Sequence, residues 1–175
     1  MVVAWYNVGH SAAKGNGPMS DQGFQVLAHA LADAQPRSVL AVGPLAGEVA
    51  TRLFDRETTK QIALDTGEAS DALARQGVVD IAILTDTLER LDRREASGLL
   101  ARLRDVYARR VVLLVAHDRC QWSGTDLTAL GFSRLHDAPG AGTLYGFDIA
   151  TYKTTPDWLN PDYWANPELW ERHRW

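Results

Sequence analysis

The fold of this chain is decided by the stretch Val79-Asp80-Ile81-Ala82-Ile83-Leu84-Thr85-Asp86-Thr87-Leu88-Glu89-Arg90-Leu91. An acidic residue opens a short apolar run, a second acidic residue closes it, and a Leu-Glu-x-Leu segment follows at once. A compact apolar run bounded in this way predicts a buried strand that ends in a turn. Asp86 and Glu89 therefore come directly after the strand, at the end where open α/β sheets bind their ligands.

Further strands and helices alternate on both sides of this stretch. Apolar runs predict strands, and apolar residues three or four positions apart predict helices between them. The expected strands are residues 39–42, 62–64, 80–84, 111–116, 132–136 and 143–149. The expected helices are residues 20–35, a segment that starts at Glu48, residues 71–76, a segment through residues 96–106, and residues 126–130. Residues 43–47 are expected to form a loop.

Local signals set some of the helix boundaries. Ser20 is a candidate N-cap for the first helix, and Pro36 should stop it. The clearest helix is expected to turn one apolar face to the core, formed by Ala96, Leu99, Leu103 and Val106.

Alternating apolar strands and amphipathic helices predict an α/β protein with a doubly wound, mostly parallel sheet covered by helices on both faces. Pro139-Gly140-Ala141-Gly142 is a turn cluster between the last two strands, which predicts a closing antiparallel hairpin. We expect an N-terminal lead-in over residues 1–19, one α/β domain over residues 20–153, and a Trp-rich C-terminal tail over residues 154–175.

Composition excludes several classes of protein. Hydrophobic residues make up 46% and charged residues 23% of the chain, as in globular rather than disordered proteins. A net charge of -4 and a pI near 5.7 argue against a protein whose main task is to grip nucleic acid. Cys120 is the only cysteine, and no apolar run approaches the ~20 residues that a membrane helix needs. Together with an N-terminus that lacks an export-type pattern, these features predict a cytoplasmic protein.

Residues 79–91 resemble the fourth strand and the following turn of class I S-adenosylmethionine (SAM) methyltransferases. Many members of that family have Asp-Val-Leu-Glu-His-Leu where this chain has Asp86-Thr87-Leu88-Glu89-Arg90-Leu91. The resemblance covers residues 36–150 and implies a Rossmann-like fold that ends in an antiparallel hairpin. The chain as a whole is similar to a small uncharacterised bacterial family with methyltransferase-like architecture.

The resemblance implies a glycine loop against the cofactor SAM, directly after the first strand. The family pattern Gly-x-Gly-x-Gly falls on Gly43-Pro44-Leu45-Ala46-Gly47. Gly43 and Gly47 are the expected cofactor-binding positions, because glycines let the backbone approach the ligand closely. Leu45 stands in place of the middle glycine, and Ala41 in place of an acidic residue of the strand. We therefore expect this loop to be degenerate for SAM.

Asp65 ends the second expected strand, where the family places the carboxylate that accepts the ribose hydroxyls. The residue types alone leave a second interpretation open, in which Asp65 caps the helix that starts near Glu68. Residues 65–80 leave little room for both a helix and the third strand of the family. That strand is expected to be shortened or missing.

Asp86 and His117 are the candidate catalytic residues, since both follow strands at the carboxyl edge and could accept a proton from a substrate. Glu89 is expected beside them at the mouth of the site. An ordinary strand-to-helix turn would also place acidic residues here, near a helix N-terminus. A Cys-His nucleophile built on Cys120 or a metal site would need further partners that the spacing does not supply.

The C-terminal tail carries four of the six tryptophans, which are Trp158, Trp164, Trp170 and Trp175. Three of them follow a capping residue, a proline and an acidic residue, a pattern that predicts brief helical turns. The rings could cover an exposed part of the sheet, or they could dock a protein partner or a second copy in a homodimer. Acidic residues between the rings oppose binding to nucleic acid.

Three functions are open on these residues. The first is an active SAM-dependent methyltransferase that acts on an unknown acceptor. The second is a methyltransferase-like domain that is degenerate for SAM and acts as a binding or scaffold module. The third is a different α/β enzyme that uses Asp86 and His117 for small-molecule chemistry. Leu45, Ala41 and the shortened third-strand region favour the second function.

Overall fold

A computed structural model describes residues 18–152, with the backbone alone for residues 18–20 and for Ser70. Its strands are β1 (Ser38–Val42), β2 (Lys60–Leu64), β3 (Val79–Thr85), β4 (Ala108–Val115), β5 (Ser133–Ala138) and β6 (Gly142–Asp148). Its helices are α1 (Pro18–Ala30), α2 (Pro44–Leu53), α3 (Ala69–Gln76), α4 (Arg93–Arg102), α5 (Gly124–Ala129) and α6 (Ile149–Tyr152). A π-helical turn, Leu103–Tyr107, extends α4.

The six strands form one sheet in the order β2-β1-β3-β4-β6-β5. The first four strands of that order are parallel, whereas β6 pairs antiparallel with both β4 and β5. This is the doubly wound, mostly parallel sheet with a closing hairpin that the sequence predicts, and it has the Rossmann-like methyltransferase architecture. The chain reverses its direction of winding between β1 and β3, so the topological switch point lies at their carboxyl ends.

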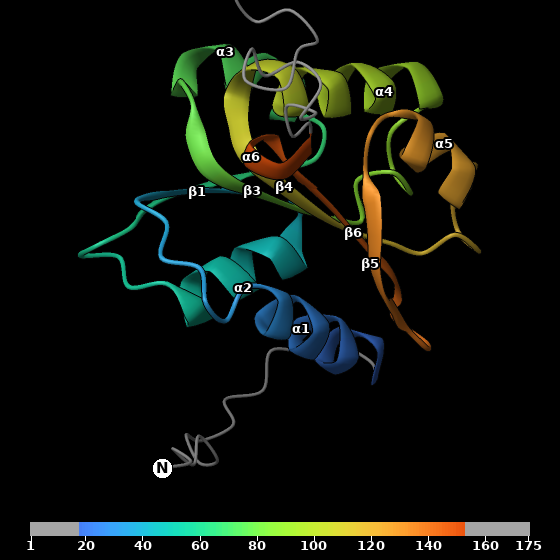
Figure 1. Ribbon diagram of the computed structural model, residues 1–175, viewed down its shortest axis with the longest axis horizontal. Helices are drawn as coiled ribbons and strands as arrows, with labels where there is room; N and C mark the ends of the chain where they lie inside the picture. The colour runs from blue at the N-terminus through green and yellow to red at the C-terminus, as the bar shows by residue number, and fades with distance from the viewer. Residues whose placement is uncertain (1–17, 153–175) are drawn as a thin grey trace, which may run out of the picture.

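Helices cover both faces of the sheet (Figure 1), and each face has its own apolar core. On one face, α1 and α2 pack against the sheet through side chains such as Leu27 and Val49. On the other face, α3, α4 and α5 contribute a larger core. Along β4 the side chains alternate between the two, with Val112 and Leu114 facing α1 and α2. A run that is apolar at every position is therefore buried on both faces.

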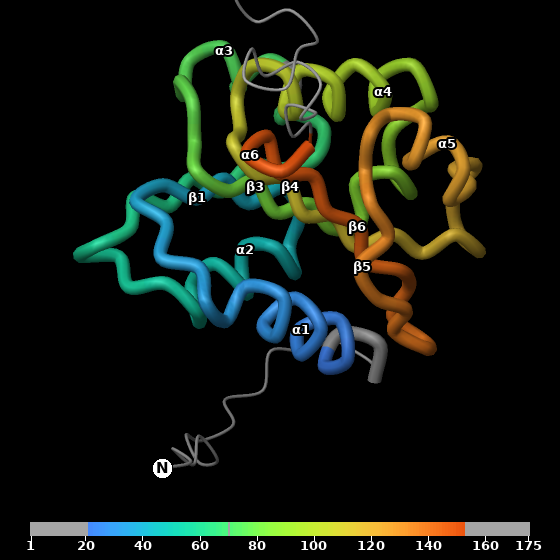
Figure 2. Tube along the Cα trace, viewed as in Figure 1, coloured from blue at the N-terminus to red at the C-terminus, as the bar shows by residue number. Residues whose placement is uncertain are grey.

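No strand lies between α3 and β3, where the family has its third strand, so the prediction that this strand is shortened or missing is confirmed. Only Gly77 and Val78 separate α3 from β3, and the tube in Figure 2 shows the direct connection. Gly77 has a φ of +70°, which lets the chain leave α3 and enter β3 without a loop. Because the third strand is missing, β2 is an edge strand of the sheet.

Three predictions about the helices are wrong, and two of them concern where a helix begins or ends. The helix α1 begins at Pro18 and ends at Ala30, so Ser20 lies inside it and Pro36 lies well beyond its end. The helix α2 begins at Pro44 rather than at Glu48, so residues 44–47 are helical and not a loop.

Val106 is the third error, because its side chain is 54% exposed and does not join the core. The three other predicted positions on that helix face are buried. The π-helical turn has more residues per turn than an α-helix, so the helical spacing that places Leu103 in the core no longer applies to Val106.

Candidate functional site at the carboxyl edge of the sheet

The segments that follow β1, β3 and β4 meet at the carboxyl edge of the sheet, beside the switch point. This is where ligands bind in open α/β sheets. Gly43 follows β1, Thr85 ends β3 and Ala116 follows β4, and Thr85 is almost fully buried. These three segments carry most of the residues that the sequence singles out as a site.

Gly43 is required by the fold at its position. Its φ is +96°, a conformation that residues with a Cβ rarely adopt. A Cβ added there would lie 2.2 Å from the backbone oxygen of Thr85. The close approach that glycine permits is thus an approach to β3. Gly47, by contrast, lies inside α2, and an added Cβ would meet no described atom within 4 Å.

The N-terminus of α2 has little left to offer a ligand. Pro44 is the first residue of the helix and has no backbone N–H. The backbone N–H of Ala46 donates a hydrogen bond of 3.1 Å to the side-chain oxygen Oγ1 of Thr85. Residues near a helix N-terminus normally present such donors to water or to an anion. Here a buried side chain of the neighbouring strand accepts one of them.

Leu45 packs towards α1 at this edge. It is partly buried and joins the core of the α1 and α2 face. A Cβ added at Gly23, on α1, would lie 3.0 Å from the side chains of both Leu45 and Leu114. The helix α1, the start of α2 and the end of β4 are therefore in close contact where the family keeps only backbone.

Asp65 lies directly after β2, next to Gly43, whose backbone N–H donates to the Leu64 carbonyl at 3.2 Å. Its side chain is exposed, and Oδ1 accepts the N–H of Thr66 at 2.8 Å. The Asp65 carbonyl accepts the N–H of Glu68 at 3.1 Å. Asp65 therefore stabilises a turn before α3, and its side chain does not cap that helix, whose N-cap Glu68 has no side-chain cap bond.

Asp86 occupies a strained backbone conformation. Its φ is +52°, the one positive φ outside glycine in the described part of the chain. Such conformations cluster at sites and at tight turns. The side chain of Arg119 lies 3.3 Å from the Asp86 carboxylate in a partly exposed ion pair. The predicted base is thus paired with a cation from the segment after β4.

Glu89 joins the segments that follow β3 and β4. Its Oε1 accepts the backbone N–H of Ala116 at 2.7 Å. Its Oε2 is buried and has no hydrogen-bond partner within residues 18–152. Burial raises the pKa of this carboxyl above its ordinary value of 4.5. The sequence places Glu89 at the mouth of the site, but the bond to Ala116 and the raised pKa become apparent only in the fold.

His117 is held by hydrogen bonds on both ring nitrogens. Nδ1 lies 2.8 Å from the carbonyl oxygen of Trp122, and Nε2 lies 2.9 Å from the hydroxyl of Tyr145. A carbonyl only accepts, so Nδ1 carries the proton, and in the neutral ring Nε2 accepts from Tyr145. The second predicted base is thus bonded to its own protein through both nitrogens.

Arg93, at the start of α4, fixes the loop that contains His117. Its guanidinium donates to the carbonyl of Gln121 at 3.0 Å, pairs with Asp126 at 2.6 Å and lies over the buried ring of Trp122. The hydrogen bond from Arg93, together with the backbone and side-chain hydrogen bonds from Ser123, holds the pKa of Asp126 well below its usual value. Ser123 and Asp126 form a capping box at the start of α5, a signal that the sequence pattern already contains.

At this edge Asp65, Asp86 and Glu89 supply carboxylates, and Arg119 supplies a cation beside Asp86. Besides burial, the nearby charge of Asp86 raises the pKa of Glu89, whereas the charge of Arg119 lowers it. Within residues 18–152 there is no cluster of three or more potential metal ligands. The described helices are all too short or too polar to cross a bilayer.

Comparisons with known proteins place the chain in a family and give only weak structural likenesses. A family model described as a family of unknown function, DUF6231, matches residues 21–175. Curated proteins give no significant match in sequence.

Among solved structures, the chain is similar to phosphoethanolamine N-methyltransferase 2 of Haemonchus contortus, in complex with phosphomonomethylethanolamine and S-adenosylhomocysteine, with 14% identity and a TM-score of 0.48. That match covers 68% of this chain and 30% of the other, so this chain spans less than a third of that enzyme. It is also similar to magnesium protoporphyrin IX methyltransferase of Synechocystis PCC 6803 with bound SAM, with 17% identity, a TM-score of 0.46, and coverage of 73% and 77%. The architecture given above rests on the strand order and not on these likenesses.

Proposed function

This chain belongs to the DUF6231 family of unknown function, and we propose that its methyltransferase-like domain is degenerate for SAM and acts as a binding or scaffold module. The observation that carries the proposal is the closed start of α2. There the helix begins immediately after Gly43, and the N–H of Ala46 is bound by Thr85. The protein itself thus binds the Ala46 N–H, one of the backbone donors that would face a cofactor.

The residues around α2 do not fit SAM in the manner of the family. Leu45 places a branched side chain against α1 where the family has a glycine. Ala41 has no carboxylate to offer at the end of β1. Gly47 is an ordinary helical residue. Of the two expected glycines, Gly43 alone has a constrained geometry, and the carbonyl of Thr85 explains that constraint.

The candidate bases also support a binding role over catalysis. His117 has partners on both nitrogens, and a general base must have a nitrogen within reach of the substrate's proton. Asp86 is paired with Arg119. The same contacts weigh against a different α/β enzyme that would use these two residues for small-molecule chemistry.

One observation favours the alternative, an active SAM-dependent methyltransferase on an unknown acceptor. Asp65 lies exposed after β2 and next to Gly43, as a carboxylate that accepts ribose hydroxyls would. Its second oxygen, Oδ2, makes no hydrogen bond to the described residues, since the bond to Thr66 uses Oδ1. In this alternative the protein holds the ribose through Asp65 despite the closed α2.

Calorimetric titration of the full-length protein with SAM and with S-adenosylhomocysteine separates the two functions. A degenerate module gives no binding heat at millimolar ligand, and its melting temperature stays unchanged, because a ligand stabilises only a fold that binds it. Binding in the micromolar range would contradict the proposal. Loss of that binding in the variant Asp65→Ala, with the fold intact, would then establish the ribose carboxylate.

A further inference from the structure

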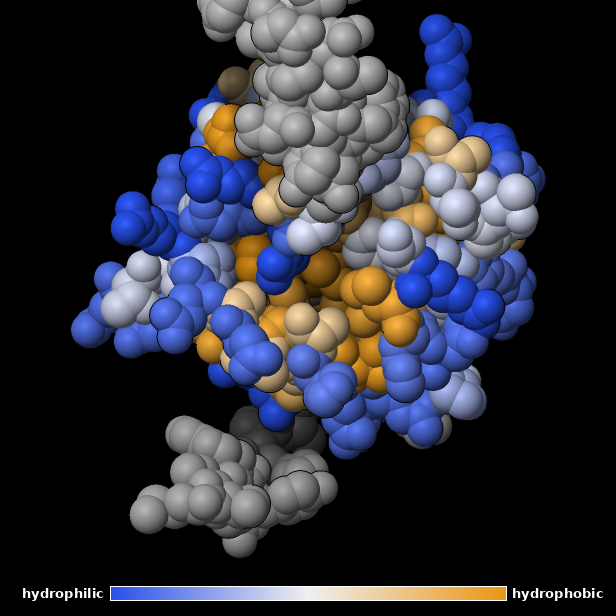
Figure 3. Space-filling view, in the orientation of Figure 1, coloured by the Kyte–Doolittle hydropathy of each residue, from blue (hydrophilic) through white to orange (hydrophobic). Residues whose placement is uncertain are grey.

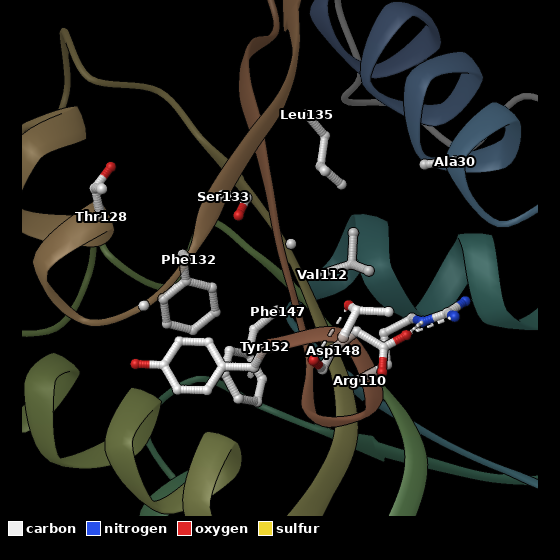
Figure 4. A pocket seen from close by; sticks show the side chains of 13 residues that line it. Ala30, Arg110, Val112, Thr128, Phe132, Ser133, Leu135, Phe147, Asp148 and Tyr152 are labelled. Atoms are coloured by element: carbon white, nitrogen blue, oxygen red, sulfur yellow. Dashed lines mark hydrogen bonds and ion pairs between the residues drawn. The ribbon is translucent and has the colours of Figure 1, made fainter. Parts of the chain in front are cut away.

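An apolar groove lies at the other end of the sheet, beside β6. We name it the β6 groove, and its apolar lining is formed by Val112, Phe132, Leu135, Gly146, Phe147 and Tyr152. Its volume is about 620 Å³, within the range of small-molecule sites. Figure 4 shows the rings of Phe132, Phe147 and Tyr152 together, with Leu135 and Ala30 across from them. The Arg110 and Asp148 side chains lie at its side, near the amino end of β4.

The groove exists because the helices on the α1 face leave part of the sheet uncovered. The helix α1 buries Leu27 and Leu31 against the sheet and ends at Ala30, which lines the groove. Beyond that point β6 carries Gly146, which adds no side chain to the sheet surface. Figure 3 shows apolar side chains gathered between α1 and α6, with charged side chains around them.

A bulge in the edge strand shapes one wall. The pairing of β5 with β6 shifts register between Arg134 and His136, so Leu135 is the extra residue. Its side chain folds over Gly146, where an added Cβ would lie only 2.7 Å from it. Leu135 is nevertheless 53% exposed. Leu135 lines the same groove as Tyr152, which is 45% exposed, so the two side chains add large exposed apolar surface to one site.

The charged residues of the groove neutralise each other. Arg110 pairs with Asp148 at 2.7 Å, and both side chains belong to strands that form the floor. Val112, Phe132 and Phe147 are almost fully buried, so the apolar side chains that the groove leaves accessible are Leu135 and Tyr152, at 53% and 45% exposed. Such a surface suits aromatic rings better than it suits an ionic ligand.

The chain itself leaves the fold at this groove. Tyr152, the last described residue, lies in its wall, with its ring 5.0 Å from that of Phe147 and in contact distance of Gly131. The Trp-rich tail follows directly, and Trp158 is six residues further along the chain. Six extended residues span about 20 Å, enough to reach any part of the groove. The family model continues to Trp175, so the tail belongs to the matched sequence.

We propose that the β6 groove is the docking site for the Trp-rich tail of the same chain. The tail begins at the wall of the groove, so its effective concentration there is in the millimolar range or above, which no separate partner matches. Its tryptophans are the residues that contribute most per side chain to an apolar contact. This proposal is independent of whether SAM binds, because the groove and the candidate site lie at opposite ends of the sheet.

The test uses full-length protein labelled with 5-fluorotryptophan and observed by fluorine NMR. Each of the six tryptophans gives one resonance, which single Trp→Phe replacements assign. Two variants block the groove from different walls, Leu135→Glu and Ala30→Glu, and both change exposed side chains. Ala74→Glu is the matched control, since Ala74 is an exposed alanine of α3 on the other face of the sheet.

We expect both groove variants to move the same tail resonances towards the position of free 5-fluorotryptophan. The control should leave them in place, and the wild-type spectrum should not change with protein concentration. The proposal is overturned if neither groove variant moves a tail resonance, or if Ala74→Glu moves them equally. It is also overturned if the tail resonances shift with concentration as dimers form, because the groove would then hold the tail of a second copy.

Discussion

At the residue scale, Gly43 and Thr85 decide what the carboxyl edge can do. The two residues end neighbouring parallel strands, and the positive φ of Gly43 brings its backbone against the Thr85 carbonyl. The hydroxyl of Thr85 then binds the start of α2 through Ala46. One residue pair thereby fixes the backbone at the position where the resemblance to methyltransferases implies a cofactor loop.

Replacing the two glycines should have opposite effects on stability. We expect Gly43→Ala to lower the free energy of unfolding by about 2–4 kcal/mol, because it combines left-handed strain with a backbone clash. We expect Gly47→Ala to raise it by about 0.5–1 kcal/mol, since alanine is the better helix former and its Cβ meets no described atom. Urea unfolding of both variants measures the difference. Equal effects would show that Gly43 has no special geometry.

Thr85→Val tests the bond that closes α2. Valine keeps the shape of threonine and removes the acceptor for the Ala46 N–H, which is buried. We expect a loss of about 1–2 kcal/mol in the free energy of unfolding, as for the loss of a helix cap. Thr85→Ser retains the hydroxyl and serves as the control for that bond. A valine variant as stable as the wild type would contradict the closed helix start.

Glu89 should make stability depend on pH. Because burial raises its pKa above 4.5, the folded protein binds the Glu89 proton more tightly than the unfolded chain does. The contribution of Glu89 to stability is therefore fully present below about pH 4.5 and is lost as pH rises through the raised pKa.

Glu89→Gln removes this dependence and keeps an oxygen that can accept the Ala116 N–H. We expect the variant to match the wild type most closely below pH 4.5 and to gain in relative melting temperature towards neutral pH. Melting curves across this range measure the gap. A gap that stays constant with pH would show that Glu89 titrates normally.

At the element scale, the missing third strand turns β2 into an edge strand. None of the side chains of β2 is fully buried, whereas most of those in β3 are. An edge strand presents one row of backbone groups that no neighbouring strand pairs. The strand is short, with only five residues, and Lys60 opens it, which are two features that protect sheet edges.

The backbone amides of the strands should therefore exchange with solvent at different rates. We expect amides of β2 to exchange at least tenfold faster than those of β3 and β4, because local opening at an edge needs less free energy than global unfolding. Mass spectrometry of peptic fragments measures the rates in the native protein. Protection of β2 equal to that of β3 would mean that a segment outside residues 18–152, or a second copy, covers this edge.

The sequence predicts most of the strands and helices correctly, but it predicts poorly where the helices begin and end. Apolar runs such as Val111–Ala116 identify buried strands, and the short segment after Asp65 correctly predicts the loss of one strand. The glycines at 43 and 47 instead suggest a loop where Pro44 begins a helix. Whether a glycine serves a turn, a ligand or a neighbouring strand depends on a contact such as that with Thr85, which no local pattern contains.

The same limit applies to the candidate site. Strand order predicts that Asp86 and His117 share one edge, and the structure places the segments that carry them there. The bonds of His117 to Trp122 and Tyr145 come from a loop and from β6, so they depend on the folded chain. The roles of Gly43, Gly47 and Asp65 in cofactor binding stay predictions.

At the scale of the whole molecule, the two ends of the sheet differ in character. At the carboxyl edge Thr85 accepts the Ala46 N–H and Leu45 packs towards α1, whereas the β6 groove at the other end leaves apolar side chains accessible (Figure 3). The expected packing of the tail over residues 154–175 lies outside the described residues and enters here as the proposal for the groove.

Removal of the tail should lower the melting temperature of the whole domain. We expect the chain that ends at Thr154 to melt several degrees below the full-length protein, because the apolar wall of the β6 groove would lose its cover. Calorimetric melting of both chains measures the change. If the truncated protein keeps the melting temperature of the full-length protein and stays monomeric, the tail does not stabilise the domain.

The central claim is that the start of α2 is closed to SAM, and one NMR titration tests it directly. Full-length protein labelled with nitrogen-15 is titrated with SAM, and the backbone amides of Gly43, Leu45, Ala46 and Asp65 are followed. The account predicts no saturable shift at these amides at millimolar SAM, and slow exchange with solvent for the Ala46 N–H that Thr85 accepts. Saturable shifts at Gly43, Leu45 and Asp65 would contradict it and identify a working cofactor site.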